Sequence, residues 1–299
     1  MRQAVLVAPH EFRIREVDIP SPGPGDVVIA VQAAGICGSD LHTYHGENPV
    51  ITLPKVMGHE LSGTIVACGP GVSLPAGQVV AIEPDVPCGQ CDYCRVGLTH
   101  YCTDMRFVGS LRYDGAFADY VLAPAATAFP LPAGLSAVEG AMAEPCAVAV
   151  HALRKIADVP NTSVLVLGCG TIGLLIAQTA KAYGAARLAI TDVLERKLQT
   201  ARALGINCTI NPSRDNLADR VREQFGPTGP DVTFDCVGLR ESKFLWTGNL
   251  HVARTGVNGN APTRRKKVET YCSPGGCLPH GDQCALASWY ACPNLTAVA

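Results

Sequence analysis

Four cysteines with short, regular spacing give the clearest chemical signal in the sequence: Cys88-x2-Cys91-x2-Cys94-x7-Cys102. Thiolates are soft donors that suit zinc, and four thiols this close in sequence can wrap one ion tetrahedrally. Because sulfur would then fill every coordination position, none would remain for water or substrate. The spacing therefore predicts a structural zinc site. Four unrelated reduced cysteines or an iron–sulfur cluster are the alternatives, and nothing else in the sequence indicates electron transfer.

A second set of candidate ligands consists of Cys37 and the pair His59-Glu60, in the same half of the chain. Each of these residues alone is more often an ordinary surface or core side chain than a metal ligand. Glu144 stands in an otherwise apolar stretch, where an unpaired carboxylate would be costly to bury and a neighbouring cation would remove that cost. Together with the four-cysteine group, these residues indicate a second metal site.

The third signal is Gly168-x-Gly170-x-x-Gly173, which directly follows the apolar run 163–167 and opens an apolar helix. Such glycines permit a tight turn and let a pyrophosphate approach the helix N-terminus, where free N–H groups and the helix dipole favour anions. In this context the motif predicts a dinucleotide site. A glycine turn in some other α/β protein is the alternative.

Asp192 ends the next apolar run, 19 residues beyond Gly173. A carboxylate about 20 residues beyond the motif commonly hydrogen-bonds a ribose 2′-hydroxyl. Asp192 therefore favours NAD over NADP, because a 2′-phosphate would meet a like charge. Arg187, Arg196 and Lys197 are close in sequence and would soften the preference.

Two different patterns of secondary structure are predicted for the segments that carry these residues. Residues 1–145 alternate short apolar runs with Gly and Pro turns, which predicts a β-rich domain with strands at 4–7, 27–31, 62–66, 79–82 and 118–122. Residues 146–244 show the βαβ pattern of a parallel sheet. The expected strands are 164–167, 188–191, 208–210 and 232–236, and the expected helices are 174–183, 195–204 and 217–225.

Residues 245–299 resemble neither half, since they mix Gly, Pro, Cys, Asn and basic residues without strand or helical periodicity. We expect a disordered or non-native tail. A small cysteine-rich metal module is the alternative, although Cys272-x4-Cys277 and Cys284-x7-Cys292 are loosely spaced for zinc ligands.

The composition fits two compact domains, with 47% hydrophobic and 17% charged residues in a chain of 299. A net charge of −2 leaves no basic surplus for binding nucleic acid. No apolar run approaches the roughly 20 residues of a membrane span. With no signal peptide in view, the 14 cysteines indicate reduced thiols and metal binding rather than disulfides, and we expect a cytoplasmic protein.

Taken together, the segment Gly58-His59-Glu60-x2-Gly63-x5-Gly69-x2-Val72, the four-cysteine group and the glycine motif resemble the zinc-containing medium-chain alcohol and polyol dehydrogenases. The stretch that begins at Glu144 is most similar to the sorbitol and xylitol dehydrogenase branch. The resemblance covers residues 1 to about 240. It implies an α/β protein with a GroES-like catalytic domain over 1–145, a truncated Rossmann domain over 146–244, and a non-family tail over 245–299. The doubly wound parallel sheet of the Rossmann domain would keep the strand order 3-2-1-4.

The resemblance also implies roles for single residues. A catalytic zinc would bind Cys37, His59 and one or both of Glu60 and Glu144, and would act as a Lewis acid while hydride leaves for NAD. A structural zinc would bind the four-cysteine group. Ser39 would relay the substrate proton, and His42 would carry it toward solvent. The NAD site would comprise Gly168, Gly170, Ile172, Gly173, Asp192 and Lys197.

The implied substrate is a small polyol or hydroxy acid. Tyr44 follows Thr43, as in threonine and aldonate dehydrogenase relatives, whereas the sorbitol branch has Tyr at the position of Thr43. An aldonate or threonine dehydrogenase is therefore the alternative enzyme. A catalytically inactive zinc-binding remnant is the alternative from another class, because the family's last Rossmann strands are not recognisable in the tail. The family also implies a homo-oligomer, an expectation that truncation of the second domain weakens.

Overall fold

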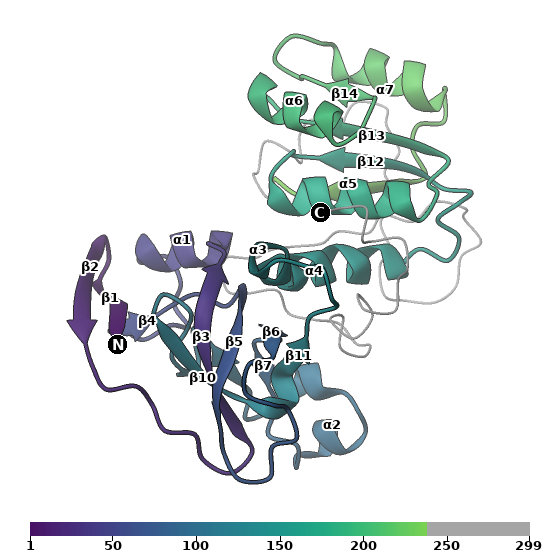
Figure 1. Cartoon of the computed structure of the whole chain (residues 1–299). Coiled ribbons are helices and arrows are strands. Elements are labelled where there is room, and N and C mark those ends of the chain that lie inside the picture. Colours follow the sequence, from purple (N-terminus) through teal and green to yellow (C-terminus); the bar gives the residue numbers. More distant parts are fainter. Residues whose placement is uncertain (238–299) are drawn as a thin grey trace. The chain divides into compact units, whose positions relative to one another are not determined.

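The computed structural model describes residues 1–237, and within them two compact units meet in sequence between Glu144 and Pro145. The first unit is β-rich and the second is α/β, as the fold prediction required (Figure 1). The predicted tail, 245–299, lies outside the described residues. No helix in the described part of the chain is long and apolar enough to cross a membrane.

The first unit contains short strands separated by turns. They are β1 (Arg2–Ala8), β2 (Glu11–Glu16), β3 (Asp26–Ala34), β4 (Lys55–Val56), β5 (Leu61–Cys68), β6 (Val79–Ile82), β7 (Asp85–Val86), β8 (Arg106–Val108), β9 (Arg112–Tyr113), β10 (Tyr120–Pro124) and β11 (Ala128–Pro130). An antiparallel sheet has the order β10-β3-β5-β6-β11, and two smaller sheets have the orders β2-β1-β4 and β7-β8-β9. The five predicted strands all form, with ends that shift by a few residues.

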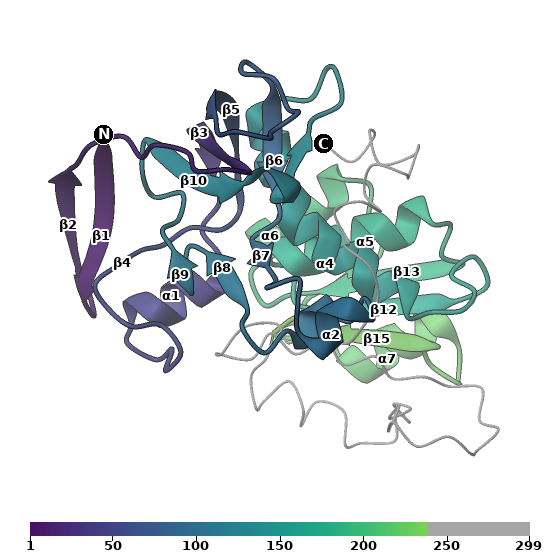
Figure 2. The ribbon, with the colours of Figure 1, turned by 90° about the horizontal axis from the view of Figure 1, so that it is seen from below.

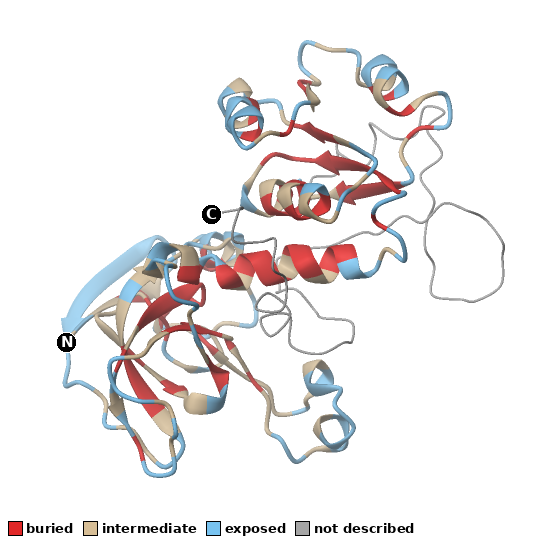
Figure 3. Ribbon diagram, turned by 45° about the vertical axis from the view of Figure 1, so that its right-hand side comes forward, coloured by how far each residue is buried: buried red, intermediate tan, exposed pale blue. Residues whose placement is uncertain are grey.

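The strands of this unit surround an apolar core in which Ile29, Ile65 and Ile82 are fully buried. Alternating side chains of antiparallel strands point to opposite faces, so every second residue reaches that core. By contrast, all six residues of β2 are exposed (Figure 3). Phe12 and Ile14 alternate with charged residues in this strand, and it was not among the strands expected from the sequence.

Short helices connect these strands. They are α1 (Gly38–Tyr44), α2 (Asp92–Arg95), η1 (Thr99–Tyr101), η2 (Ala125–Thr127), α3 (Ala137–Ala141) and α4 (Ala143–Arg154), which crosses the boundary between the units. A capping box starts α3, since Ser136 Oγ accepts from Glu139 N–H and the Glu139 carboxylate accepts from Ser136 N–H. The sequence reading missed these helices, because most are too short to show a helical period.

The second unit has the parallel sheet that the βαβ pattern predicted (Figure 2). Its elements are β12 (Ser163–Leu167), α5 (Thr171–Ala182), β13 (Arg187–Thr191), α6 (Glu195–Ala203), β14 (Thr209–Ile210), α7 (Leu217–Phe225) and β15 (Val232–Asp235). The strand order β14-β13-β12-β15 confirms the predicted 3-2-1-4. In such sheets the order in which successive strands are added reverses beside the first strand, and ligands bind beyond the carboxyl ends of the strands at that point.

Candidate functional site

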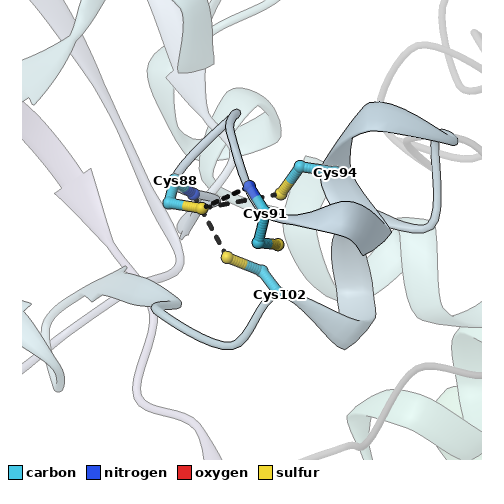
Figure 4. Close-up of side chains that lie close together, drawn as sticks. All are labelled: Cys88, Cys91, Cys94 and Cys102. Atoms are coloured by element: carbon cyan, nitrogen blue, oxygen red, sulfur yellow. Dashed lines mark hydrogen bonds between the residues drawn. The ribbon is translucent and has the colours of Figure 1, made fainter.

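The four-cysteine group lies between β7 and β8 and brings its sulfurs together (Figure 4). The Sγ atoms of Cys88, Cys91, Cys94 and Cys102 all lie within 4.8 Å of one another. Cys91 is the N-cap of α2, Cys94 lies in that helix, and Cys102 follows η1. Two very short helices thus fold a loop so that its thiols converge. Every described cysteine is free, as expected for reduced thiols.

Backbone N–H groups of the same loop point at these sulfurs. Cys88 N–H donates to Cys102 Sγ at 3.2 Å, and Cys91 N–H donates to Cys88 Sγ at 3.4 Å. Hydrogen bonds from the backbone N–H groups of Cys94 and Thr103 lower the pKa of the Cys91 thiol to about 6. The loop therefore favours the thiolate, the form that binds metal, at Cys91, whereas desolvation and the neighbouring thiols raise the pKa of Cys94. Four sulfurs with this support fit a closed zinc site.

A second group joins residues from two separate segments. Cys37 follows β3 and caps α1, while His59 and Glu60 occupy the turn between β4 and β5. The Cys37 sulfur and one atom each of His59 and Glu60 lie within 4.8 Å of one another. The antiparallel pairing of β3 with β5 brings the two segments together, and Gly35 N–H donates to Glu60 O at 2.7 Å just beyond the last paired residues.

His59 is buried among groups that limit its movement. The edge of its ring meets Phe107, with ring centroids 5.5 Å apart, and its Nδ1 lies 3.8 Å from a carboxylate oxygen of Asp40. The other Asp40 oxygen accepts from Cys37 N–H at 2.9 Å. Asp85 pairs in register with Phe107, and its charge also acts on His59. Carboxylates of this kind orient the imidazole of a metal-binding histidine.

Glu144 begins the first turn of α4 and does not belong to the 4.8 Å group. Its charge nevertheless acts on the Cys37 thiol. Sequence reasoning had left open whether Glu60, Glu144 or both would bind the metal. The geometry brings Glu60 into the group and leaves Glu144 near enough to act on it electrostatically.

Burial dominates the electrostatics of this second group. It raises the pKa of the Cys37 thiol to about 11, with further upward contributions from Glu60 and Glu144. It also raises the pKa of Glu60 and of Asp40, although the charge of His59 opposes both shifts. Several acids thus share a buried site with one imidazole, and a divalent cation would offset the cost. A donor set of thiol, imidazole and carboxylate fits a catalytic zinc.

Ser39 and His42 both lie on α1. Ser39 hydrogen-bonds the Cys37 thiol, and its carbonyl accepts from the hydroxyl of Thr43 at 2.9 Å. His42 is three residues further along the helix, and residues three apart share one helix face. Its Nδ1 lies 2.8 Å from a carboxylate oxygen of Glu47. The helix therefore leads from a metal-ligand candidate to a solvent-exposed acid.

The glycine motif has the backbone geometry that a dinucleotide turn needs. Gly168 has a φ of +90°, which favours glycine. A Cβ on Gly173 would lie 1.9 Å from the Gly168 carbonyl oxygen, so only glycine lets α5 start so close to the strand end. A Cβ on Gly170 would meet no atom within 4 Å, so that side of the N-cap is open. Ile172 lies in the first turn of the same helix.

Asp192 follows β13 and bridges to this turn. Its carboxylate accepts from Cys169 N–H and from Leu194 N–H, each at 2.9 Å, and lies 3.3 Å from Lys197 Nζ. Burial would raise the pKa of Asp192, but the N–H bonds and Lys197 outweigh burial and hold it below the usual value. The carboxylate is therefore ionised at neutral pH and is already fixed in place beside the glycine turn.

Sequence reasoning missed Asp40, Asp85 and Phe107 around His59, and Glu47 beside His42. Asp40 carries a usable signal, because an acid three residues after an N-cap is typical of a helix start. Asp85 and Phe107 give no local signal, since only the pairing of β7 with β8 puts them at His59.

Comparison with known proteins identifies both units. The sequence model of the alcohol dehydrogenase GroES-like domain matches residues 23–133. The model described as zinc-binding dehydrogenase matches residues 171–255, past the predicted end of the second domain at residue 244.

Individual relatives agree with these matches. The chain is 39% identical to L-idonate 5-dehydrogenase of Vitis vinifera over 80% of the chain and 68% of the relative. It is 38% identical to sorbitol dehydrogenase of Arabidopsis thaliana over 80% of the chain and 68% of the relative. Among solved structures, a zinc-binding dehydrogenase from Sinorhizobium meliloti bound to NADP is 35% identical, with a TM-score of 0.75 over 81% of this chain and 71% of that one.

Proposed function

This chain belongs to the zinc-containing medium-chain alcohol and polyol dehydrogenases, and on that premise we propose that it transfers hydride from a secondary alcohol of a small polyol to NAD. One observation carries the proposal. Cys37, His59 and Glu60 converge within 4.8 Å in a buried site of the first unit. The site mixes donor types, whereas a purely structural site is usually closed by four similar ligands.

The residues of the first unit have distinct tasks in this reaction. Cys37, His59 and Glu60 would hold zinc, and the charge of Glu144, which acts on Cys37, would help to balance the ion. When bound, the ion supplies Lewis acidity at the substrate oxygen. Ser39 accepts the hydroxyl proton and passes it to His42, one helical turn away. Asp40 and Phe107 restrain the His59 ring, so that its metal-binding nitrogen keeps its direction.

In the second unit, Gly168 and Gly173 set the tight turn after β12, and the open side of Gly170 admits a pyrophosphate at the start of α5. Ile172 and Lys197 flank this site. NAD supplies the hydride acceptor. The Asp192 carboxylate has lone pairs left for a ribose hydroxyl and repels a 2′-phosphate, which supports NAD over NADP. Lys197 offsets part of that repulsion.

The sorbitol dehydrogenase among the relatives supports a polyol substrate, and the L-idonate 5-dehydrogenase supports an aldonate. Both substrate types are small, polar and rich in secondary hydroxyls. An aldonate or threonine dehydrogenase is the second candidate, favoured by Tyr44 directly after Thr43.

The experiment uses the purified full chain with sorbitol, xylitol, L-idonate and L-threonine, each with NAD and with NADP, and reads formation of the reduced nicotinamide. We expect reduction with a polyol and NAD, and about one zinc for each of the two ligand clusters by mass spectrometry. Asp192→Asn should move the preference toward NADP by roughly tenfold, the equivalent of about 1.4 kcal/mol.

Other outcomes separate the alternatives. Turnover of L-idonate or L-threonine alone would assign the second candidate. Two bound zinc ions without NAD binding in calorimetry would identify a zinc-binding remnant and overturn the proposal.

A further inference from the structure

His42 contacts an acidic side chain, Glu47, to which the proposed function assigns no role. The Nδ1 atom of His42 lies 2.8 Å from Glu47 Oε2, and the Glu47 backbone N–H donates to the His42 carbonyl, also at 2.8 Å. Two contacts, one between side chains and one between backbones, thus join the same two residues.

The chain between them is shaped to bring Glu47 back to the helix. Gly46 has a φ of +75°, and its N–H donates to Thr43 O at 3.0 Å, so the backbone turns sharply after α1. Asn48 Nδ2 then donates to the buried Thr43 hydroxyl at 3.2 Å. Hydrogen bonds on both sides of Glu47 therefore fix its place relative to His42.

The contact also fixes where the ring carries its proton. The pKa of Glu47 is lowered, mainly by the hydrogen bond with His42. The charges of His42 and His45 make smaller contributions in the same direction. An ionised carboxylate only accepts hydrogen bonds, so His42 Nδ1 must carry the hydrogen. In the neutral ring, Nε2 is then left as the acceptor.

We propose that Glu47 is a positioning residue for the proton step, because it holds His42 in the Nδ1–H tautomer and leaves Nε2 free to receive the proton. This inference rests on the proposed function. The hydroxyl proton moves through Ser39 to His42 Nε2, the ring becomes an imidazolium beside the Glu47 carboxylate, and a proton then leaves to solvent. The hydride goes to NAD, so the alcohol loses two electrons and two hydrogens in total.

An ordinary surface ion pair is the competing account. Exposed pairs of this kind contribute little to stability, and removing one would leave kcat unchanged. The pair of Arg13 with Glu11 is such a case, at 2.6 Å and similarly exposed. It supplies a matched control, because Glu11→Gln removes an acid of the same type from a pair remote from His42.

The first test records nitrogen NMR spectra of the histidines in the full chain, with His42→Asn for assignment. We expect His42 to carry hydrogen on Nδ1 in the wild type. In Glu47→Ala we expect the Nε2–H form, which free imidazole side chains prefer, to gain population. Wild-type His42 in the Nε2–H form would overturn the proposal whatever the activity.

The second test is kinetic. Glu47→Gln should lower kcat about tenfold, a part of the roughly 10²–10⁴ that proton transfer by a positioned group contributes. KM should stay within about twofold, and Glu47→Asp, which keeps the charge, should restore part of kcat. Equal kcat in Glu47→Gln and Glu11→Gln would sink the inference and leave the proposed function standing. Absence of NAD reduction by the wild type would instead refute the proposed function.

Discussion

Thiols occur in both ligand clusters of the first unit, but their surroundings differ. In the four-cysteine group, N–H groups of the loop itself bring the pKa of Cys91 down to about 6. In the second group, Cys37, His59 and Glu60, which we call the mixed group, burial and two carboxylates raise the pKa of Cys37 to about 11. The loop thus stabilises its own thiolate, whereas the mixed group accumulates acids that only a cation would balance. The four-cysteine group therefore suits a structural ion, and the mixed group suits a catalytic ion that also binds substrate.

Removing the thiol of the mixed group should give the largest loss of activity. We expect Cys37→Ser to lower turnover by roughly three orders of magnitude, because Lewis acidity accounts for several kcal/mol of the barrier. The same variant should lose one of two zinc equivalents and keep its fold by circular dichroism. Cys68→Ser is the control, since Cys68 is exposed and belongs to neither cluster. Full zinc content in Cys37→Ser would contradict the assignment.

Removing a thiol from the four-cysteine group should affect structure first. Cys94→Ser leaves three sulfurs for an ion whose binding also folds the loop, and structural zinc sites contribute folding free energy directly. We expect loss of the other zinc equivalent and rapid proteolysis within 88–102. Turnover should fall about tenfold, far less than in Cys37→Ser. Proteolysis at the wild-type rate would show that this loop does not depend on metal.

The glycine before the mixed group should be needed for its shape. A Cβ on Gly35 would lie 2.0 Å from Glu60 Oε2, so Gly35→Ala must displace the carboxylate. We expect roughly tenfold weaker zinc retention in chelator titrations, within the 10–100-fold range of changes that disturb ligand support. Gly38→Ala is the matched control, because its Cβ would meet no atom within 4 Å. Equal retention in the two variants would mean that Glu60 does not bind the ion.

The smallest effect is expected at Asp85. Burial raises the pKa of this carboxyl while the charge of His59 opposes the shift, and the Asp85 side chain makes no hydrogen bond or ion pair among the described residues. Asp85→Asn keeps the side-chain shape and removes the charge. We expect zinc retention to weaken by about threefold, below the range of an outer carboxylate in direct contact. A change as large as that in Gly35→Ala would make Asp85 a direct support of the site.

Residue patterns predicted the elements of the second unit in detail, including the helix over Leu217–Phe225, and the family resemblance implied their 3-2-1-4 strand order. Parallel strands buried on both faces give continuous apolar runs, and helices of nine or more residues show their period. The first unit was harder. In the exposed strand β2 only Phe12 and Ile14 alternate with charged residues, and α1, with seven residues, is too short for periodicity to identify.

The sequence by itself determined the four-cysteine group and the glycine turn, because their members are so close along the chain that local backbone geometry brings them together. It also indicated that Cys37, His59, Glu60 and Glu144 contribute to one metal site. Only the tertiary structure decided which of them meet. The pairing of β3 with β5 places Cys37 beside Glu60, and the pairing of β7 with β8 adds Asp85 and Phe107. Contacts between distant segments depend on strand register, which no local pattern encodes.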